Sequence, residues 1–160
     1  MLRDPSLVPL SHQHQHALAL CVFLHRAREA GAPDLAHWNQ EIARAFEQDI
    51  HAHFEAEENI LFPAARNVSA LVPLVEELLA EHALLRDYAQ RAASSELEAD
   101  DLPAFAALLD DHIRKEERQL FEQMQEALPG ETLAQLGAAI RDLLTARGAG
   151  AACALPLRKS

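Results

Sequence analysis

Two segments of the chain carry the same arrangement of residues that can bind a metal ion. The sequence HFEAEENILF covers residues 53–62 and HIRKEERQLF covers residues 112–121, so both read HxxxEExxLF. Side chains at positions i and i+4 lie one above the other on an α-helix. His53 is therefore expected beside Glu57, and His112 beside Glu116, which gives each segment one imidazole and one carboxylate aimed in the same direction.

The Leu-Phe pair that closes each segment indicates which way this face points. Leu61 and Leu120 each follow the histidine of their segment by eight residues, which is close to two full helical turns. An apolar side chain at that spacing predicts that the His/Glu face is turned inward. A carboxylate is costly to bury unless it is paired or coordinates a cation. Two such faces on facing helices therefore predict a metal ion between them.

Further histidines are available on two other segments. His82 lies four residues after Leu78 and three before Leu85, inside an apolar stripe. The segment LSHQHQHALAL, residues 10–20, holds three histidines at alternate positions, and a helix cannot aim all three at one point because such positions diverge by about 200°. His14 shares a face with later apolar residues and is predicted to point inward, with His16 as the alternative or additional ligand.

Each of four segments thus contributes one histidine, and two of them also contribute a glutamate. Four imidazoles and two carboxylates exceed what one tetrahedral zinc ion needs, and they suit two adjacent first-row metal ions bridged by the carboxylates. Nitrogen and oxygen donors without a thiolate favour iron, with manganese or zinc as substitutes. The predicted metal ligands are His14, His53, Glu57, His82, His112 and Glu116.

The remaining candidates are assigned lesser roles. Glu58 and Glu117 are expected to face solvent or to accept a hydrogen bond from the ring N–H of a ligand, although Glu117 is an alternative to Glu116 as the bridging carboxylate. Cys21 is expected to pack in the core, and Cys153 is expected to be incidental. Surface or outer positions are predicted for His25, His37 and His51.

The elements that must position these ligands are helices. Good helix formers dominate, no glycine occurs between Gly31 and Gly130, and no segment shows the alternation of a strand. The apolar spacing predicts helices over about 11–30, 34–65, 73–93 and 103–128, with Ser11 and Asp34 as N-caps and a short fifth helix over 131–147. Short connections favour an all-α, up-down-up-down four-helix bundle over residues 1–147, followed by a tail over 148–160.

Amino-acid composition limits the expected binding partners and the expected cellular compartment. The 160 residues are 49% apolar and 24% charged, and the formal net charge is −11. This acidic excess disfavours nucleic acid and membrane surfaces as partners. Two cysteines make no disulfide framework, no apolar run reaches the roughly 18 residues of a membrane span, and the start shows no signal-peptide pattern. We expect a cytoplasmic protein, and no protein partner is indicated.

The residues described above resemble the hemerythrin-like (HHE cation-binding) family. Its pattern is a histidine on the first helix, HxxxE on the second, a histidine on the third and HxxxE or HxxxxD on the fourth. The resemblance covers about residues 10–128, and HFEAEENILFP, residues 53–63, is its most specific part. It implies a carboxylate-bridged, non-haem di-iron centre inside an up-down bundle, with a small diatomic ligand, O2 or NO, at an open position on one iron.

The sequence departs from the oxygen-carrying relatives at one position. Those proteins place a second histidine one turn after that of the third helix, whereas here the residue four positions after His82 is Arg86. One iron then lacks an imidazole, unless His16 or another group supplies it. The missing histidine argues against reversible oxygen carriage, whereas iron binding is much less affected.

Three functional hypotheses follow. The first is a protein without enzymatic activity that binds or senses O2, NO or iron through its di-iron centre. The second is a di-iron oxidase or peroxidase, against which the order His-x-x-x-Glu counts because ferritin-like oxidases use Glu-x-x-His. The third is a metal-free helical interaction module with an acidic surface.

Overall fold

The computed structural model describes residues 2–148, which form helices and no strands. Two of the long helical rods are continuous in sequence but change helix type along their length. The described elements are α1 (Val8–Glu29), α2 (Leu35–Ala45), η1 (Phe46–Ile50), α3 (His51–Ala56), η2 (Glu57–Leu61), α4 (Phe62–Ala65), η3 (Ser69–Leu71), α5 (Val72–Ala93), α6 (Asp101–Lys115), η4 (Glu116–Leu120), α7 (Phe121–Ala127) and α8 (Gly130–Ala146).

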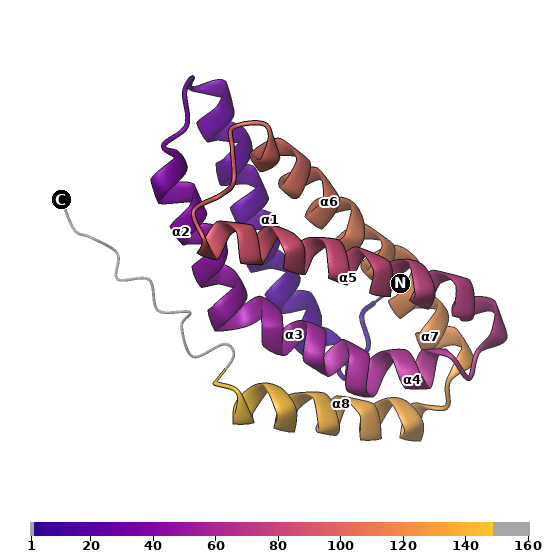
Figure 1. Ribbon diagram of the computed structural model, residues 1–160. Coiled ribbons are helices and arrows are strands. Elements are labelled where there is room, and N and C mark those ends of the chain that lie inside the picture. The colour runs from indigo at the N-terminus through magenta and orange to yellow at the C-terminus, as the bar shows by residue number, and fades with distance from the viewer. Residues whose placement is uncertain (1, 149–160) are drawn as a thin grey trace.

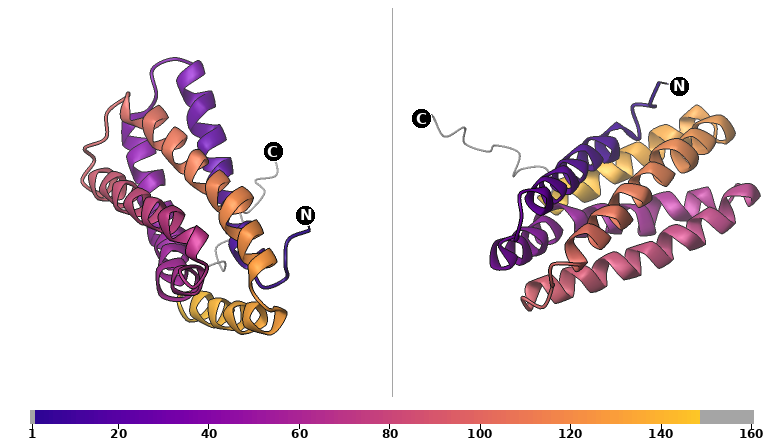
Figure 2. Two further views of the ribbon diagram at one scale, coloured as in Figure 1. Left: turned by 90° about the vertical axis from the view of Figure 1, so that its right-hand side faces the viewer. Right: turned by 90° about the horizontal axis from the view of Figure 1, so that it is seen from above.

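Four rods make an up-down-up-down bundle, which confirms the predicted fold (Figure 1). They are α1, the rod from α2 to α4, α5, and the rod from α6 to α7, and each runs back along its predecessor (Figure 2). α1 packs mainly against α6, and α2 packs against α5. None of the described helices is both long and apolar enough to cross a membrane.

The helix starts differ from the sequence prediction in two places. Ser11 is not an N-cap, because α1 already begins at Val8, with Pro9 in its first turn. The rod containing the second HxxxEExxLF segment begins at Asp101, two residues before Pro103. In both cases proline lies in the first helical turn, where its missing N–H costs no hydrogen bond. Asp34 is an N-cap as predicted, since its carboxylate accepts from the backbone N–H of His37 at 3.1 Å.

Three π-helical turns, which the sequence pattern did not predict, interrupt the two rods that carry the repeated His/Glu pattern. In η2 the N–H of Phe62 donates to the carbonyl of Glu57, and in η4 the N–H of Phe121 donates to the carbonyl of Glu116, five residues earlier in each case. η1 has the same pattern. A π turn contains one more residue than an α turn, and such turns occur frequently at functional sites. Here each of the two glutamates of the repeated pattern opens a π turn.

Buried apolar side chains form two clusters, one at each end of the bundle. One includes Leu61, Leu120 and Phe121, and the other includes Phe46, Phe54 and further residues. The buried histidines contact both clusters. Phe54 of one cluster stacks on His82 with ring centroids 3.7 Å apart, and Phe121 of the other stacks on His14 with ring centroids 5.7 Å apart. The predicted site is therefore enclosed by apolar packing at both ends.

The fifth helix, α8, has 17 residues, covers nearly the predicted range and packs against one face of the bundle. It lies along α3 and η2 (Figure 1), and Leu133, Ile140 and Leu144 are its buried leucine and isoleucine side chains. Gly137 permits its close approach to the N-terminal segment, because a Cβ on Gly137 would lie 2.6 Å from the Cβ and 2.7 Å from the Cα of Ser6. The prediction that residues 1–147 form one unit with a tail over 148–160 stays a prediction, and residues 149–160 lie outside the described part.

Replacing Gly137 by alanine is expected to destabilise the protein by about 1–3 kcal/mol, the usual cost of inserting a methyl group where no space exists. Urea unfolding followed by circular dichroism measures this change. Gly130→Ala is the matched control, because nothing lies within 4 Å of a Cβ built there and its backbone is not left-handed. A Gly137→Ala variant as stable as the Gly130→Ala variant would contradict the close contact.

Candidate metal centre

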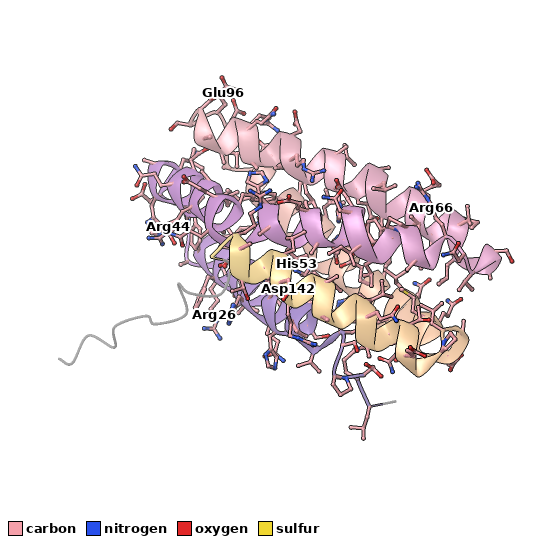
Figure 3. All side chains as sticks on the ribbon, turned by 90° about the horizontal axis from the view of Figure 1, so that it is seen from below. Arg26, Arg44, His53, Arg66, Glu96 and Asp142 are labelled. Atoms are coloured by element: carbon pink, nitrogen blue, oxygen red, sulfur yellow. The ribbon has the colours of Figure 1, made fainter. Side chains whose placement is uncertain are left out.

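The structure brings all six predicted ligands together in the middle of the bundle. Each of the four rods supplies at least one of them, and every one is buried. The residues are His14 from α1, His53 from α3, Glu57 from η2, His82 from α5, His112 from α6 and Glu116 from η4. In Figure 3 the labelled His53 lies in the middle of the bundle, whereas the labelled Arg44, Arg66 and Glu96 extend outward at its edge.

Two histidines and two carboxylate oxygens make the first of two adjoining groups, called here the His14/His53 pocket. The two Nε2 atoms lie 3.0 Å apart. Oε1 of Glu57 lies 3.1 Å from Nε2 of His53, and Oε2 of Glu116 lies 3.1 Å from Nε2 of His14. These four donor atoms all lie within 4.8 Å of one another.

The second group, the His82/His112 pocket, uses the other oxygen of each carboxylate. Its two Nε2 atoms lie 3.2 Å apart. Oε2 of Glu57 is 3.3 Å from Nε2 of His82, and Oε1 of Glu116 is 3.4 Å from Nε2 of His112. Glu57 and Glu116 therefore each present one oxygen to each pocket, which is the arrangement that a bridging carboxylate requires.

The donor set fits two cations. All four oxygens of Glu57 and Glu116 are buried without a hydrogen-bond partner, although a buried carboxylate is costly unless it is compensated. Donor atoms that bind one ion at about 2.0–2.1 Å and at right angles are separated by about 3.0 Å. The six separations given above, 3.0–3.4 Å, are close to this value, and all donor atoms of a pocket lie within 4.8 Å of one another. Two positive charges at these points would satisfy every unpaired oxygen.

The outer nitrogen of each ring has its own oxygen acceptor. Because these acceptors are oxygens, each Nδ1 carries a proton and donates it, so Nε2 is the nitrogen that is left to bind a metal ion. The pairs, each 2.7–2.8 Å long, are His14 with Glu117, His53 with Gln13, His82 with Glu58, and His112 with Glu81. Both Glu58 and Glu117 thus accept from a ring N–H, one of the two roles expected for them.

Two of these acceptors, Glu58 and Glu117, each also accept a hydrogen bond from an arginine that lies over a phenylalanine ring. Arg86 donates to Glu58 at 2.7 Å and lies over the ring of Phe54. Arg3 donates to Glu117 at 2.7 Å and lies over the ring of Phe121. Arg86, four residues after His82, thus orients an acceptor and supplies no donor atom to either pocket.

Other candidates from the sequence lie outside both pockets. His16 is exposed, so neither pocket contains it, and the exposed positions of His25, His37 and His51 agree with expectation. Cys21 is a free thiol packed in an apolar cluster, and burial raises its pKa to about 12. Cys153 lies outside the described residues.

Sequence reasoning missed two acceptors, Gln13 and Glu81. Each immediately precedes a predicted ligand, His14 or His82, yet each accepts from a histidine on a different helix. The position of each residue next to a predicted ligand was the one sequence feature that could have marked it as a candidate acceptor. It could not have shown which histidine each residue serves, because that depends on how the helices pack.

In the metal-free pockets, burial and the nearby carboxylates act in opposite directions on the pKa of two histidines. Burial alone would lower the pKa of His14, but the adjacent carboxylates of Glu116 and Glu117 raise it to about 9. For His82 burial again lowers the pKa, and Glu57 and Glu58 raise it to about 9. Burial would raise the pKa of Glu57, but His53 and His82 hold it well below its usual range. At neutral pH the metal-free site therefore holds imidazolium ions against carboxylates.

The metal-free protein is expected to lose thermal stability as the pH rises from about 6.5 to about 9.5. The pKa values of His14 and His82 are raised in the folded state, so their stabilising contribution is complete below about 6.5 and is lost as the pH passes through about 9. Melting curves of chelator-treated protein across this range measure the effect. The Glu57→Gln/Glu116→Gln double variant is the control, because it removes the facing charges. A wild-type melting temperature that stays constant or rises would contradict the pairing.

Comparison with known proteins gives one family. The model described as "Hemerythrin HHE cation binding domain" matches residues 8–124, a segment that contains all six residues of the two pockets. Searches of curated proteins and of solved structures found no significant match.

Proposed function

The chain belongs to the hemerythrin HHE cation-binding domain family, and from this premise we propose that it is a non-haem di-iron protein that binds or senses O2, NO or iron. Family membership itself implies cation binding. The observation that supports a pair of ions is that the two pockets share the carboxylates of Glu57 and Glu116. Each carboxylate presents one oxygen to one pocket and its other oxygen to the other pocket. One ion in either pocket would leave two buried carboxylate oxygens unpaired, so the arrangement favours two ions.

The donor chemistry supports iron as the metal. Each pocket offers two imidazole nitrogens and two carboxylate oxygens, and neither contains a thiolate. Imidazole and carboxylate ligands suit iron, and they also suit manganese and zinc. Manganese and zinc are therefore the substitutes that a metal analysis must distinguish from iron.

Residues around the pockets support binding of a small ligand. When bound, an iron pair supplies one-electron chemistry toward a diatomic molecule such as O2 or NO. Phe54 stacks on His82 and Phe121 lies parallel to His14, so two of the four rings are shielded by apolar faces. The Nδ1 protons are fixed on oxygen acceptors, which holds every ring in orientation. Such an enclosed site admits a diatomic molecule more readily than an organic substrate.

Two other functions compete with this proposal. A di-iron oxidase or peroxidase would show steady turnover of peroxide or of a reductant. A metal-free interaction module would purify without metal and gain no stability from it. The unpaired buried oxygens favour metal binding over the last function. We also propose a cytoplasmic setting, with O2 or NO rather than nucleic acid or a membrane as the partner.

Anaerobic loading with Fe²⁺ followed by admission of air tests the proposal. We expect two iron ions per chain by elemental analysis and a visible charge-transfer band that forms on exposure to air. The band should be lost in His53→Ala and kept in His51→Ala, because His53 is buried in a pocket whereas His51 is exposed. A colourless protein that retains no iron would overturn the proposal.

A further inference from the structure

The two pockets are built from the same ligand types, yet their surroundings differ. We infer that they bind their ions unequally: the His82/His112 pocket takes the first ion and holds it more tightly, and the His14/His53 pocket holds the exchangeable ion. The inference rests on the two-metal function proposed above and goes beyond it by ranking the two positions. Gln13 and Glu81 are the positioning residues that set the difference.

The two pockets differ in the residues that accept the Nδ1–H bonds of their histidine rings. In the His82/His112 pocket both rings donate to carboxylates, those of Glu58 and Glu81. In the His14/His53 pocket one ring donates to a carboxylate, but His53 donates to the neutral amide oxygen of Gln13. A carboxylate that accepts the Nδ1–H makes an imidazole a stronger donor to its metal than a neutral acceptor does. The first pocket therefore has two strengthened imidazoles and the second has one.

Counter-charges do not cancel this difference. The carboxylates of Glu58 and Glu117 are each paired with one arginine, Arg86 and Arg3 respectively, so one such pair lies behind each pocket. Glu81 is paired with Lys115, but that ammonium also contacts Glu77 at 2.6 Å and Asp111 at 2.9 Å. One cation shared among three acidic groups leaves the surroundings of His112 net negative. The Nδ1–H of His53, by contrast, donates to the uncharged amide of Gln13, and within residues 2–148 it has no carboxylate acceptor.

Burial gives an independent second argument. The side chains of His82 and His112 are 0% and 1% exposed, whereas those of His14 and His53 are 4% and 7% exposed. An ion in the His82/His112 pocket is thus further from solvent, and its departure requires a larger opening of the bundle. Stronger donors and slower escape act in the same direction.

Titration of the metal-free protein with Co²⁺ alone tests the order of binding. We expect two steps in the visible absorption and in competition with a chelator, the first at least tenfold tighter. Proton resonances shifted by the paramagnetic ion identify the occupied pocket. At one equivalent the shifted ring N–H signals should belong to His82 and His112, and those of His14 and His53 should follow with the second equivalent.

Two substitutions with matched controls test the cause. Glu81→Gln is expected to weaken the first step by roughly 10–100-fold, the usual effect of losing an outer partner. Glu77→Gln removes another acidic contact of Lys115 but no acceptor of a histidine, so it should weaken the first step much less than Glu81→Gln does and should leave the second step unchanged. Gln13→Glu is expected to tighten the second step by roughly tenfold, a gain that structural damage cannot produce. Gln15→Glu adds the same charge at an exposed position of α1 and is its control.

The outcomes separate this inference from the function on which it rests. Two ions bound with equal affinity, or first signals from His14 and His53, would overturn the ranking and leave the two-metal centre standing. A Gln13→Glu variant that behaves like the Gln15→Glu variant would likewise overturn it. Failure to bind more than one ion per chain would instead overturn the proposed function.

Discussion

Replacing Glu57 by glutamine is expected to abolish binding at both metal positions, although it alters one side chain. Glu57 offers Oε1 to the His14/His53 pocket and Oε2 to the His82/His112 pocket, so each pocket loses an anionic donor. The loss of affinity should exceed the roughly 10–100-fold that an outer partner contributes. Glu116→Gln should have the same effect, because its carboxylate is placed in the same way. Iron per chain after anaerobic loading and desalting measures the result.

Neighbouring substitutions show whether the effect comes from bridging. Glu58→Gln changes the next residue and removes only an acceptor of His82, so that variant should still take up two ions with weaker affinity. His14→Ala should keep the ion of the other pocket and hold about one per chain. Retention of two tightly bound ions by Glu57→Gln would refute the bridging role. Loss of only one ion would assign Glu57 to a single pocket.

Removing the metal is expected to lower the melting temperature by roughly 10–20 °C. Each ion present at 100 times its dissociation constant stabilises the folded chain by about 2.7 kcal/mol, and 1 kcal/mol corresponds to about 2–4 °C for a chain of this size. Two ions therefore give the stated range. The physical source is the set of four buried carboxylate oxygens that have no hydrogen-bond partner without metal.

Calorimetry of loaded and chelator-treated protein at pH 7 measures this difference. The Glu57→Gln/Glu116→Gln variant is the appropriate control, since it lacks the bridging charges and should melt at the same temperature with and without Fe²⁺. An unchanged melting temperature of the wild-type protein would favour the metal-free interaction module instead.

The site could be predicted from the sequence because its main signal is local. The spacing His-x-x-x-Glu places both donors on one helical face whatever the rest of the fold does, and its repetition at His112 and Glu116 removes most of the ambiguity. His82 and His14 followed from their places in apolar stripes. All six residues lie where this reasoning placed them, facing one another in the core.

The rest depended on relations between helices that a single sequence does not contain. Gln13 serves a histidine 40 positions away, and Glu81 serves one 31 positions away. The π turns were missed for a different reason, because consecutive buried residues such as Leu61 and Phe62 are compatible with an ordinary helix of wide apolar face. Only the backbone hydrogen bonds reveal that an extra residue turns both side chains inward.

The position of α8 has a practical consequence for anyone who wishes to produce a shorter fragment. The family match stops at residue 124, before α8 begins at Gly130. Ile140 and Leu144 nevertheless belong to the same apolar cluster as Leu61 and Leu120, which lie four residues after Glu57 and Glu116 respectively. A fragment trimmed to the matched segment would expose that cluster to water and is expected to self-associate. Recombinant boundaries should therefore be drawn beyond Ala146.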